Sequence, residues 1–164
     1  SNSWGGPGDT SNKALYDAVE RAKAKGVLFI AAAGNESKNN DISSEASYPA
    51  AFDNDNLIAV AATDKNDNMA FFSNFGATTV HVAAPGVNIY SLAPGNGFAT
   101  MSGTSMACPH VAGAAALLWS KNPSWDYKKV KQVLMDTVDP VSALAGKTIT
   151  GGRINVFKAI QVTK

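Results

Sequence analysis

Three short runs of apolar residues most constrain what this chain can fold into. They span residues 27–33, 57–62 and 80–84, and only His81 interrupts the last of them. Continuous apolar runs of this length are typical of strands that are buried on both faces, as in a parallel sheet. We therefore expect three buried strands.

Helical patterns precede and follow these runs. From residue 12 to residue 25, apolar side chains recur at i, i+3, i+4 and i+7, and Gly26 stands where a C-terminal glycine of a helix is expected. Residues 125–138 have a similar amphipathic pattern, and residues 156–162 predict a short final helix. Strands that alternate with helices indicate an α/β fold with a mostly parallel sheet and right-handed crossovers.

Composition limits the partners that the chain is expected to have. Hydrophobic residues make up 45% of the 164 residues, which supports a core, and this length predicts one domain. The net charge of +1 gives no reason to expect nucleic acid or a membrane as a partner. The longest apolar stretch, residues 106–119, contains Pro109 and His110 and lacks the character of a transmembrane helix.

One serine opens that apolar stretch. Ser105 follows Gly103 and Thr104, and residues 106–119 carry no charged side chain, so we expect a helix that is buried on all sides. The first N–H groups of a helix lack partners within it, and the helix dipole adds partial positive charge there. An oxyanion formed beside Ser105 would be stabilised. The alternative is that Ser105 or Thr104 only caps the helix.

The two histidines restrict the class of hydrolase. In α/β-hydrolases the nucleophile precedes the acid and the histidine, but His110, the only histidine after Ser105, lies five positions along the same helix. We expect His110 to point into the apolar run, where it is poorly placed as a base. His81 lies in an expected strand and is interpreted as a partly buried structural residue. The segment around Ser105 also reads G-x-S-x-A, not the G-x-S-x-G of the hydrolase elbow.

The stretch from residue 103 to residue 113, GTSMACPHVAG, resembles the nucleophile segment G-T-S-M-A-x-P-H-V-A-G of the subtilisin-like serine proteases, or subtilases. The resemblance implies a three-layer α/β fold with helices on both faces of the sheet, and Ser105 as the nucleophile of peptide hydrolysis. Residues 32–36, AAGNE, resemble the family's oxyanion segment, and Asn35 lies 70 residues before Ser105, as the family pattern requires. By this resemblance Asn35 stabilises the oxyanion. Taken alone, Gly-Asn after a strand is usually a turn signal.

The start of the chain resembles the family's substrate-binding strand. Residues 1–8 read as the end of a strand followed by a turn, and they contain a match to the family pattern S-[LW]-G-G. In the family this strand pairs with an extended peptide, and residues 36–49 would line the far side of its specificity pocket. A plain Gly-Pro loop is the alternative. The substrate-binding residues implied by the resemblance are Ser3, Trp4, Gly5, Gly6, Ala32, Gly34 and Thr104.

The family's H-G-T-H-V-A-G and D-[ST]-G motifs have no match in this sequence. We therefore expect residues 1–164 to be the C-terminal portion of a subtilase catalytic domain, with the base and the acid upstream of Ser1. Its partners would be a polypeptide substrate and the missing N-terminal part of the domain, and the chain alone would be inactive. Two alternatives remain: a non-catalytic module that binds a peptide or protein in the same cleft, and a fragment without a function of its own.

Neither a metal nor an organic cofactor is expected in the reaction, and the resemblance allows structural calcium. Asp64, Asn66 and Asn68 alternate as in an EF-hand loop, but Met69 and Phe75 stand where that loop needs glycine and glutamate. A solvated loop is the better interpretation.

The single cysteine, Cys108, excludes a disulfide within this sequence. We expect it to be a small buried side chain of the helix that follows Ser105. By family resemblance the protein is extracellular or secreted.

Overall fold

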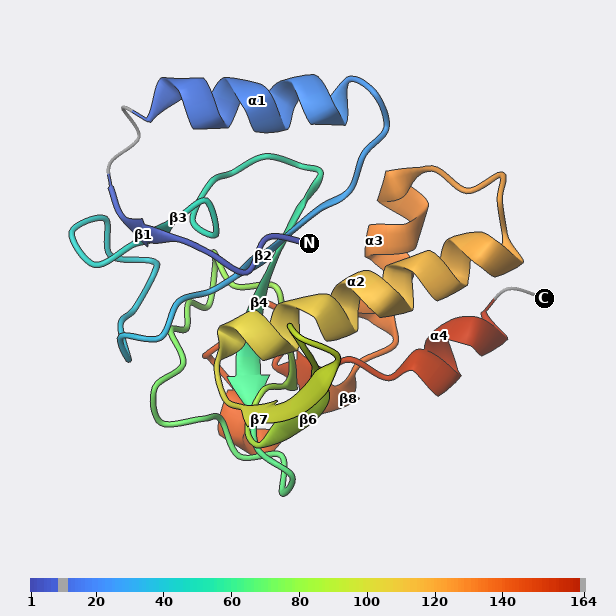
Figure 1. Ribbon diagram of the computed structural model, residues 1–164. Coiled ribbons are helices and arrows are strands. Elements are labelled where there is room, and N and C mark those ends of the chain that lie inside the picture. The colour runs from blue at the N-terminus through green and yellow to red at the C-terminus, as the bar shows by residue number, and fades with distance from the viewer. Residues whose placement is uncertain (9–11, 163–164) are drawn as a thin grey trace.

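A five-stranded sheet forms the centre of the molecule. The computed structural model describes residues 1–8 and 12–162. In spatial order the strands of the sheet are β2 (Phe29–Ala32), β4 (Leu57–Thr63), β5 (Val82–Pro85), β9 (Gly152–Arg153) and β8 (Asp139–Pro140). The first four run parallel to one another, and β8 is antiparallel to β9. Figure 1 labels β2, β4 and β8 of this sheet. The predicted α/β fold with a mostly parallel sheet is confirmed.

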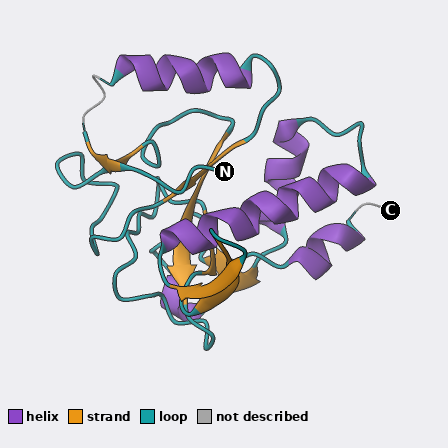
Figure 2. Cartoon of the chain, viewed as in Figure 1, coloured by secondary structure: helices purple, strands orange, loops and turns teal. Residues whose placement is uncertain are grey.

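Helices lie on both sides of this sheet (Figure 2). α2 (Thr104–Lys121), α3 (Tyr127–Asp136) and α4 (Val156–Gln161) pack on one face. α1 (Lys13–Lys23) and the short 3-10 helix η1 (Ser142–Leu144) pack on the opposite face. The three-layer arrangement implied by the family resemblance is therefore confirmed. α1, α3 and α4 lie within their predicted limits, whereas α2 extends beyond residues 106–119 at both ends and η1 was not predicted.

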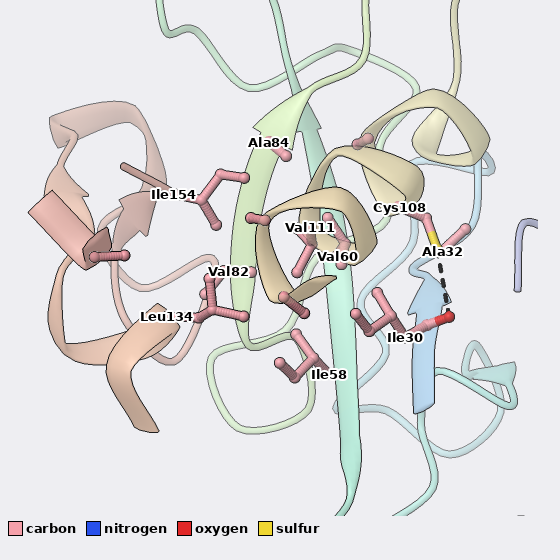
Figure 3. Packing of buried hydrophobic residues seen from close by; sticks show 14 of the residues in the cluster. Ile30, Ala32, Ile58, Val60, Val82, Ala84, Cys108, Val111, Leu134 and Ile154 are labelled. Atoms are coloured by element: carbon pink, nitrogen blue, oxygen red, sulfur yellow. Dashed lines mark hydrogen bonds between the residues drawn. The ribbon is translucent and has the colours of Figure 1, made fainter. Parts of the chain in front are cut away.

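Strand β4 is buried along its whole length. Ile58 and Val60 pack against α2, and Figure 3 shows Val111 of that helix beside them. Leu57 and Ala59, which alternate with them, pack on the other side of the sheet. A strand that is covered on both faces has no need of alternating polarity, and this explains its continuous apolar sequence.

Two small antiparallel pairs stand outside the central sheet. β1 (Gly6–Pro7) pairs with β3 (Ser47–Tyr48), and β6 (Ile89–Ala93) forms a hairpin with β7 (Gly97–Met101). The sequence analysis did not predict the hairpin, although the Pro-Gly-Asn sequence between its strands, followed by Gly97, is a recognisable turn signal. The hairpin leads directly into α2.

The prediction that the helix after Ser105 is buried on all sides is wrong. α2 buries one face against the sheet, α3 and α4, whereas His110, Gly113 and Leu117 are exposed. The sheet can cover only one side of α2. The exposed face of the helix is also apolar, and no packing among the described residues accounts for this. Cys108 is fully buried, as predicted.

Candidate active site

The N-terminus of α2 lies beside the carboxyl ends of β4 and β5, where open α/β sheets bind their ligands. Gly86, just after β5, connects the two regions: its N–H donates to Thr63 O (2.9 Å), and its carbonyl accepts from Gly103 N (2.7 Å). A Cβ at Gly86 would lie only 2.6 Å from Ala62 Cβ and 2.8 Å from Gly103 O. The absence of a side chain therefore lets the turn before α2 approach the sheet.

Ser105 lies in the first turn of α2 and bonds to the N-terminal segment. Its hydroxyl donates to Ser3 O (3.1 Å), and the Ser3 hydroxyl donates to Ser105 O (2.8 Å). The N-cap position is occupied by Gly103, without a side-chain cap. The alternative that Ser105 or Thr104 serves only as a cap is therefore wrong, and the Ser105 hydroxyl faces the segment expected to bind substrate.

Asn35 follows β2 and is held by Thr104. Its Oδ1 accepts from Thr104 N (2.8 Å) and from Thr104 Oγ1 (2.9 Å), while Thr104 Oγ1 accepts from Gly34 N (3.2 Å). Asn35 Oδ1 thus accepts two hydrogen bonds, both from Thr104. No described residue accepts a hydrogen bond from Asn35 Nδ2, so the donor side of this exposed amide is available to a ligand.

A buried asparagine that the sequence analysis missed supports this loop. Asn74 is fully buried, and its Oδ1 accepts from Glu36 N and Lys38 N, both at 3.0 Å. Its Nδ2 donates to Glu36 Oε2 (2.8 Å), which also accepts from Asn35 N (2.9 Å). Gly34 has φ +112°, and a Cβ there would overlap Asn74 Nδ2. Nothing in the local sequence around residue 74 signals this role.

Ser105, Asn35 and Thr104 line a cavity of about 170 Å³. Of the residues predicted for the site, all except Gly6 line it, and Glu36 joins them. Gly6 lies in β1, where it pairs with Tyr48. Thr104 is fully buried at the cavity wall, whereas Trp4 is about half exposed. The structure thus brings together segments that lie near residues 4, 35 and 105 in the sequence.

A second cavity, of about 310 Å³, lies on the other side of Ser105. The hairpin and α2 form it, and its lining includes Ile89, Met101, Met106 and His110. Ser105 therefore stands between two cavities, and an extended chain that passes over its hydroxyl would have room on both sides.

Neither histidine is placed to accept the proton of Ser105. His110 is exposed, contrary to the prediction that it points into the apolar run, and its Nδ1 lies 2.8 Å from Met106 O. It lies on the outer side of α2, which the sheet does not cover. His81 lies just before β5, at the opposite end of that strand from Gly86.

His81 is a partly buried structural residue, as predicted. Its Nδ1 accepts from Ala59 N (3.1 Å). Burial, with a smaller contribution from the charge of Lys131, lowers the pKa of His81 from 6.5 to about 3. The imidazole is therefore neutral at physiological pH and bonded within the fold.

The described residues contain no group of three or more His, Cys, Asp or Glu side chains that could hold a metal ion. Asp64 closes its own loop, because Oδ1 accepts from Asn66 N (2.8 Å) and Asn68 N (2.9 Å). Residues 65, 66 and 68 of this loop are exposed. None of the helices within residues 1–8 and 12–162 is long and apolar enough to span a membrane.

The chain is similar to a protein family and to several known proteins. The model described as "Subtilase family" matches residues 1–154. Subtilisin DY from Bacillus licheniformis is 44% identical over 161 residues, which cover 97% of this chain and 55% of the relative. Thermitase from Thermoactinomyces vulgaris is 43% identical over 154 residues, covering 94% and 51%.

A third relative, Subtilisin BL from Lederbergia lenta, is 48% identical over 123 residues, or 75% of this chain and 43% of the relative. The chain thus spans about half the length of these curated relatives or less. The solved structure of the prenylagaramide maturation protease PagA superposes with a TM-score of 0.83 at 29% identity, covering 99% of this chain and 61% of that one.

Proposed function

The chain belongs to the subtilase family, and from that premise we propose that it carries the nucleophile and the oxyanion-stabilising groups of a serine endopeptidase. The observation that carries the proposal is the cavity that Ser105 and Asn35 both line. Thr104 N and Thr104 Oγ1 both donate to Asn35 Oδ1, and these two hydrogen bonds orient the amide before any substrate arrives. Donors that are oriented in advance stabilise charge in a transition state without the cost of reorganising them.

In the proposed reaction, Ser105 Oγ attacks the carbonyl carbon of a peptide bond. The negative charge that develops on the carbonyl oxygen is stabilised by Asn35 Nδ2–H, by the N–H of Ser105 and by the positive end of the α2 dipole. The base that another polypeptide segment would supply takes the Ser105 Oγ proton and gives it to the leaving nitrogen as the C–N bond breaks. The amine product is released, and water then hydrolyses the acyl-enzyme on Ser105.

The N-terminal segment would bind the substrate chain. Ser3, Trp4 and Gly5 line the same cavity as Ser105, and backbone groups of such a segment can pair with an extended peptide. A Cβ at Gly5 would lie 2.9 Å from Tyr48 O, so a side chain at this position would disturb the wall that the segment forms. The substrate is accordingly a polypeptide, and by family the site of action is extracellular.

The base and the acid would come from another polypeptide segment. The Ser105 hydroxyl donates to the carbonyl of Ser3, and a peptide carbonyl is far too weak a base to take its proton. Within the described residues neither histidine bonds to Ser105: His81 precedes β5 at its far end, and the Nδ1 of His110, which lines the second cavity, lies 2.8 Å from Met106 O. We therefore expect the 164-residue chain to show no peptidase turnover by itself, although it holds the nucleophile.

The test is to assay a peptide substrate and a serine-directed fluorophosphonate probe in two samples. One contains the chain alone, and the other contains the chain with a polypeptide that carries the family's H-G-T-H-V-A-G and D-[ST]-G motifs. We expect turnover and labelling of Ser105 only in the mixture. Ser105→Ala should abolish both. Ser102→Ala should retain them, because Ser102 is exposed and its hydroxyl accepts a hydrogen bond from Asn88 N (2.8 Å) at the base of the hairpin.

Turnover by the chain alone that Ser105→Ala removes would contradict the division of the site between two segments. A mixture that binds peptide but neither turns it over nor labels Ser105 would favour the non-catalytic binding module. Absence of association between the two polypeptides, established by size-exclusion chromatography, would favour a fragment without a function of its own.

A further inference from the structure

Lys131 occupies an uncommon environment for a lysine, away from Ser105. It lies on α3, half-buried against the segment that leads into β4, and its Nζ donates to Leu57 O (2.6 Å) and Asp55 O (3.0 Å). Both acceptors are uncharged carbonyls. Within the described residues Lys131 forms no ion pair, because the Asp55 carboxylate pairs with Lys128 (3.7 Å) and accepts from Tyr127 Oη (3.2 Å).

A half-buried ammonium without a paired carboxylate is less stable than one in water. Burial therefore lowers the pKa of Lys131 from 10.5 to about 8, and the charge of Asp55 opposes the shift only in part. At pH 7.5 about a quarter of the amines would be neutral, against about 0.1% for an ordinary lysine. Asp53, Asp55 and Lys128 are the charged groups around it, and His81 is neutral at this pH.

Lys131 also lines two cavities. One, of about 260 Å³, is bounded by the loop before β4, by Thr79 and by His81. The other, of about 320 Å³, is shallow and open, and contains Lys128 and Met135. The first includes the Asn54 side chain, whose Oδ1 is buried and has no partner among the described groups. The amine thus adjoins a polar space large enough for a small acyl group.

We propose that Lys131 is a site of selective N-acylation by small activated acyl donors such as acyl phosphates. The neutral Nζ attacks the acyl carbon and forms a C–N bond, the C–O bond to phosphate breaks, and phosphate leaves with its electron pair. One Nζ proton passes to solvent. The amide product keeps a single N–H, so one of the two bonds to Asp55 O and Leu57 O is retained and the other is lost.

The test uses acetyl phosphate on the folded 164-residue chain, with acetylation at each lysine followed by mass spectrometry from pH 6.5 to 9.5. At pH 7.5 we expect Lys131 to react at least about tenfold faster than Lys128, which is exposed and lies one turn earlier on α3. The rate at Lys131 should reach half its maximum near pH 8. The same measurement in concentrated urea should abolish the preference, because the chain is then unfolded.

Two variants test the physical cause. Asp55→Asn removes the charge that favours the ammonium but keeps the backbone carbonyl that accepts from Nζ, so the rate at Lys131 should rise about two- to fourfold at pH 7. Lys131→Arg should remove the fast-reacting peptide and leave the other lysines unchanged. Equal rates at Lys131 and Lys128, or a preference that persists in urea, would overturn the proposal.

Discussion

Acid should destabilise this fold through His81, and the structure gives the size of the effect. The side chain is partly buried just before β5, where its Nδ1 accepts a hydrogen bond from Ala59 N. Protonation would place a charge in the interior and would remove that acceptor. Burial first, and Lys131 second, lower the pKa of His81 to about 3, compared with 6.5 for an ordinary histidine.

The sign follows from the protons that each state binds. Between pH 6.5 and pH 3 the unfolded chain carries a proton on His81 that the folded chain does not, so stability falls as the pH falls through this window. Above pH 6.5 the imidazole is neutral in both states and the contribution is complete. Relative to pH 7, the loss is about 2 kcal/mol at pH 5 and about 3 kcal/mol at pH 4.

Urea unfolding at pH 7, 6, 5 and 4 would measure this loss in the wild-type chain and in His81→Asn. The asparagine offers an oxygen near the position of Nδ1 but cannot be protonated. The pKa values of some carboxylates, such as Asp41 and Asp139, are lowered in the fold, so their protonation in acid also lowers the free energy of unfolding. This contribution is equal in both proteins. The free energy of unfolding of the wild type should therefore fall by about 2 kcal/mol more than that of the variant between pH 7 and pH 5.

His110→Asn is the matched control, since it removes the exposed histidine that bonds only within α2. Its pH dependence should follow that of the wild type. Parallel curves for the wild type and His81→Asn would refute the reasoning, because they would mean that His81 takes up its proton without opposing the fold.

Three further changes have expected outcomes. Leu118→Ala removes a fully buried side chain of α2 and should lower the free energy of unfolding by about 2–5 kcal/mol, whereas Leu117→Ala, at an exposed position one residue earlier, should cost less than about 1 kcal/mol in the same urea titration. Asp126→Ala removes the acceptor of Lys129 N (2.8 Å) at the start of α3 and should cost about 1 kcal/mol; Asp126→Asn keeps an acceptor and should cost less. Asn35→Ala in the complemented protease should lower kcat by about 10²- to 10³-fold with little change in KM, which is the magnitude known for the oxyanion-hole asparagine of subtilisin. An unchanged kcat would exclude Asn35 as an oxyanion donor.

The sequence determined the elements whose burial is complete or whose chemistry lies in one segment. β4 is covered on both faces, and its sequence is therefore a continuous apolar run that predicts a buried strand. Ser105 and Asn35 each lie in a contiguous motif, and the resemblance of these motifs to those of the family is the basis of their proposed roles. The hairpin escaped prediction because Tyr90, Leu92 and Phe98 are apolar although exposed, so its strands lack the polarity contrast on which such a prediction depends.

Only the tertiary structure decided how these segments act on one another. Asn74 fixes the loop of Gly34 from 40 residues away, and Gly86 admits the turn before α2 because no side chain stands between that turn and the sheet. The pKa values of His81 and Lys131 depend on what removes water from each group and on which charges lie near. Residues distant in the sequence determine how far a side chain is desolvated and how closely two segments approach. A local sequence pattern therefore cannot predict either.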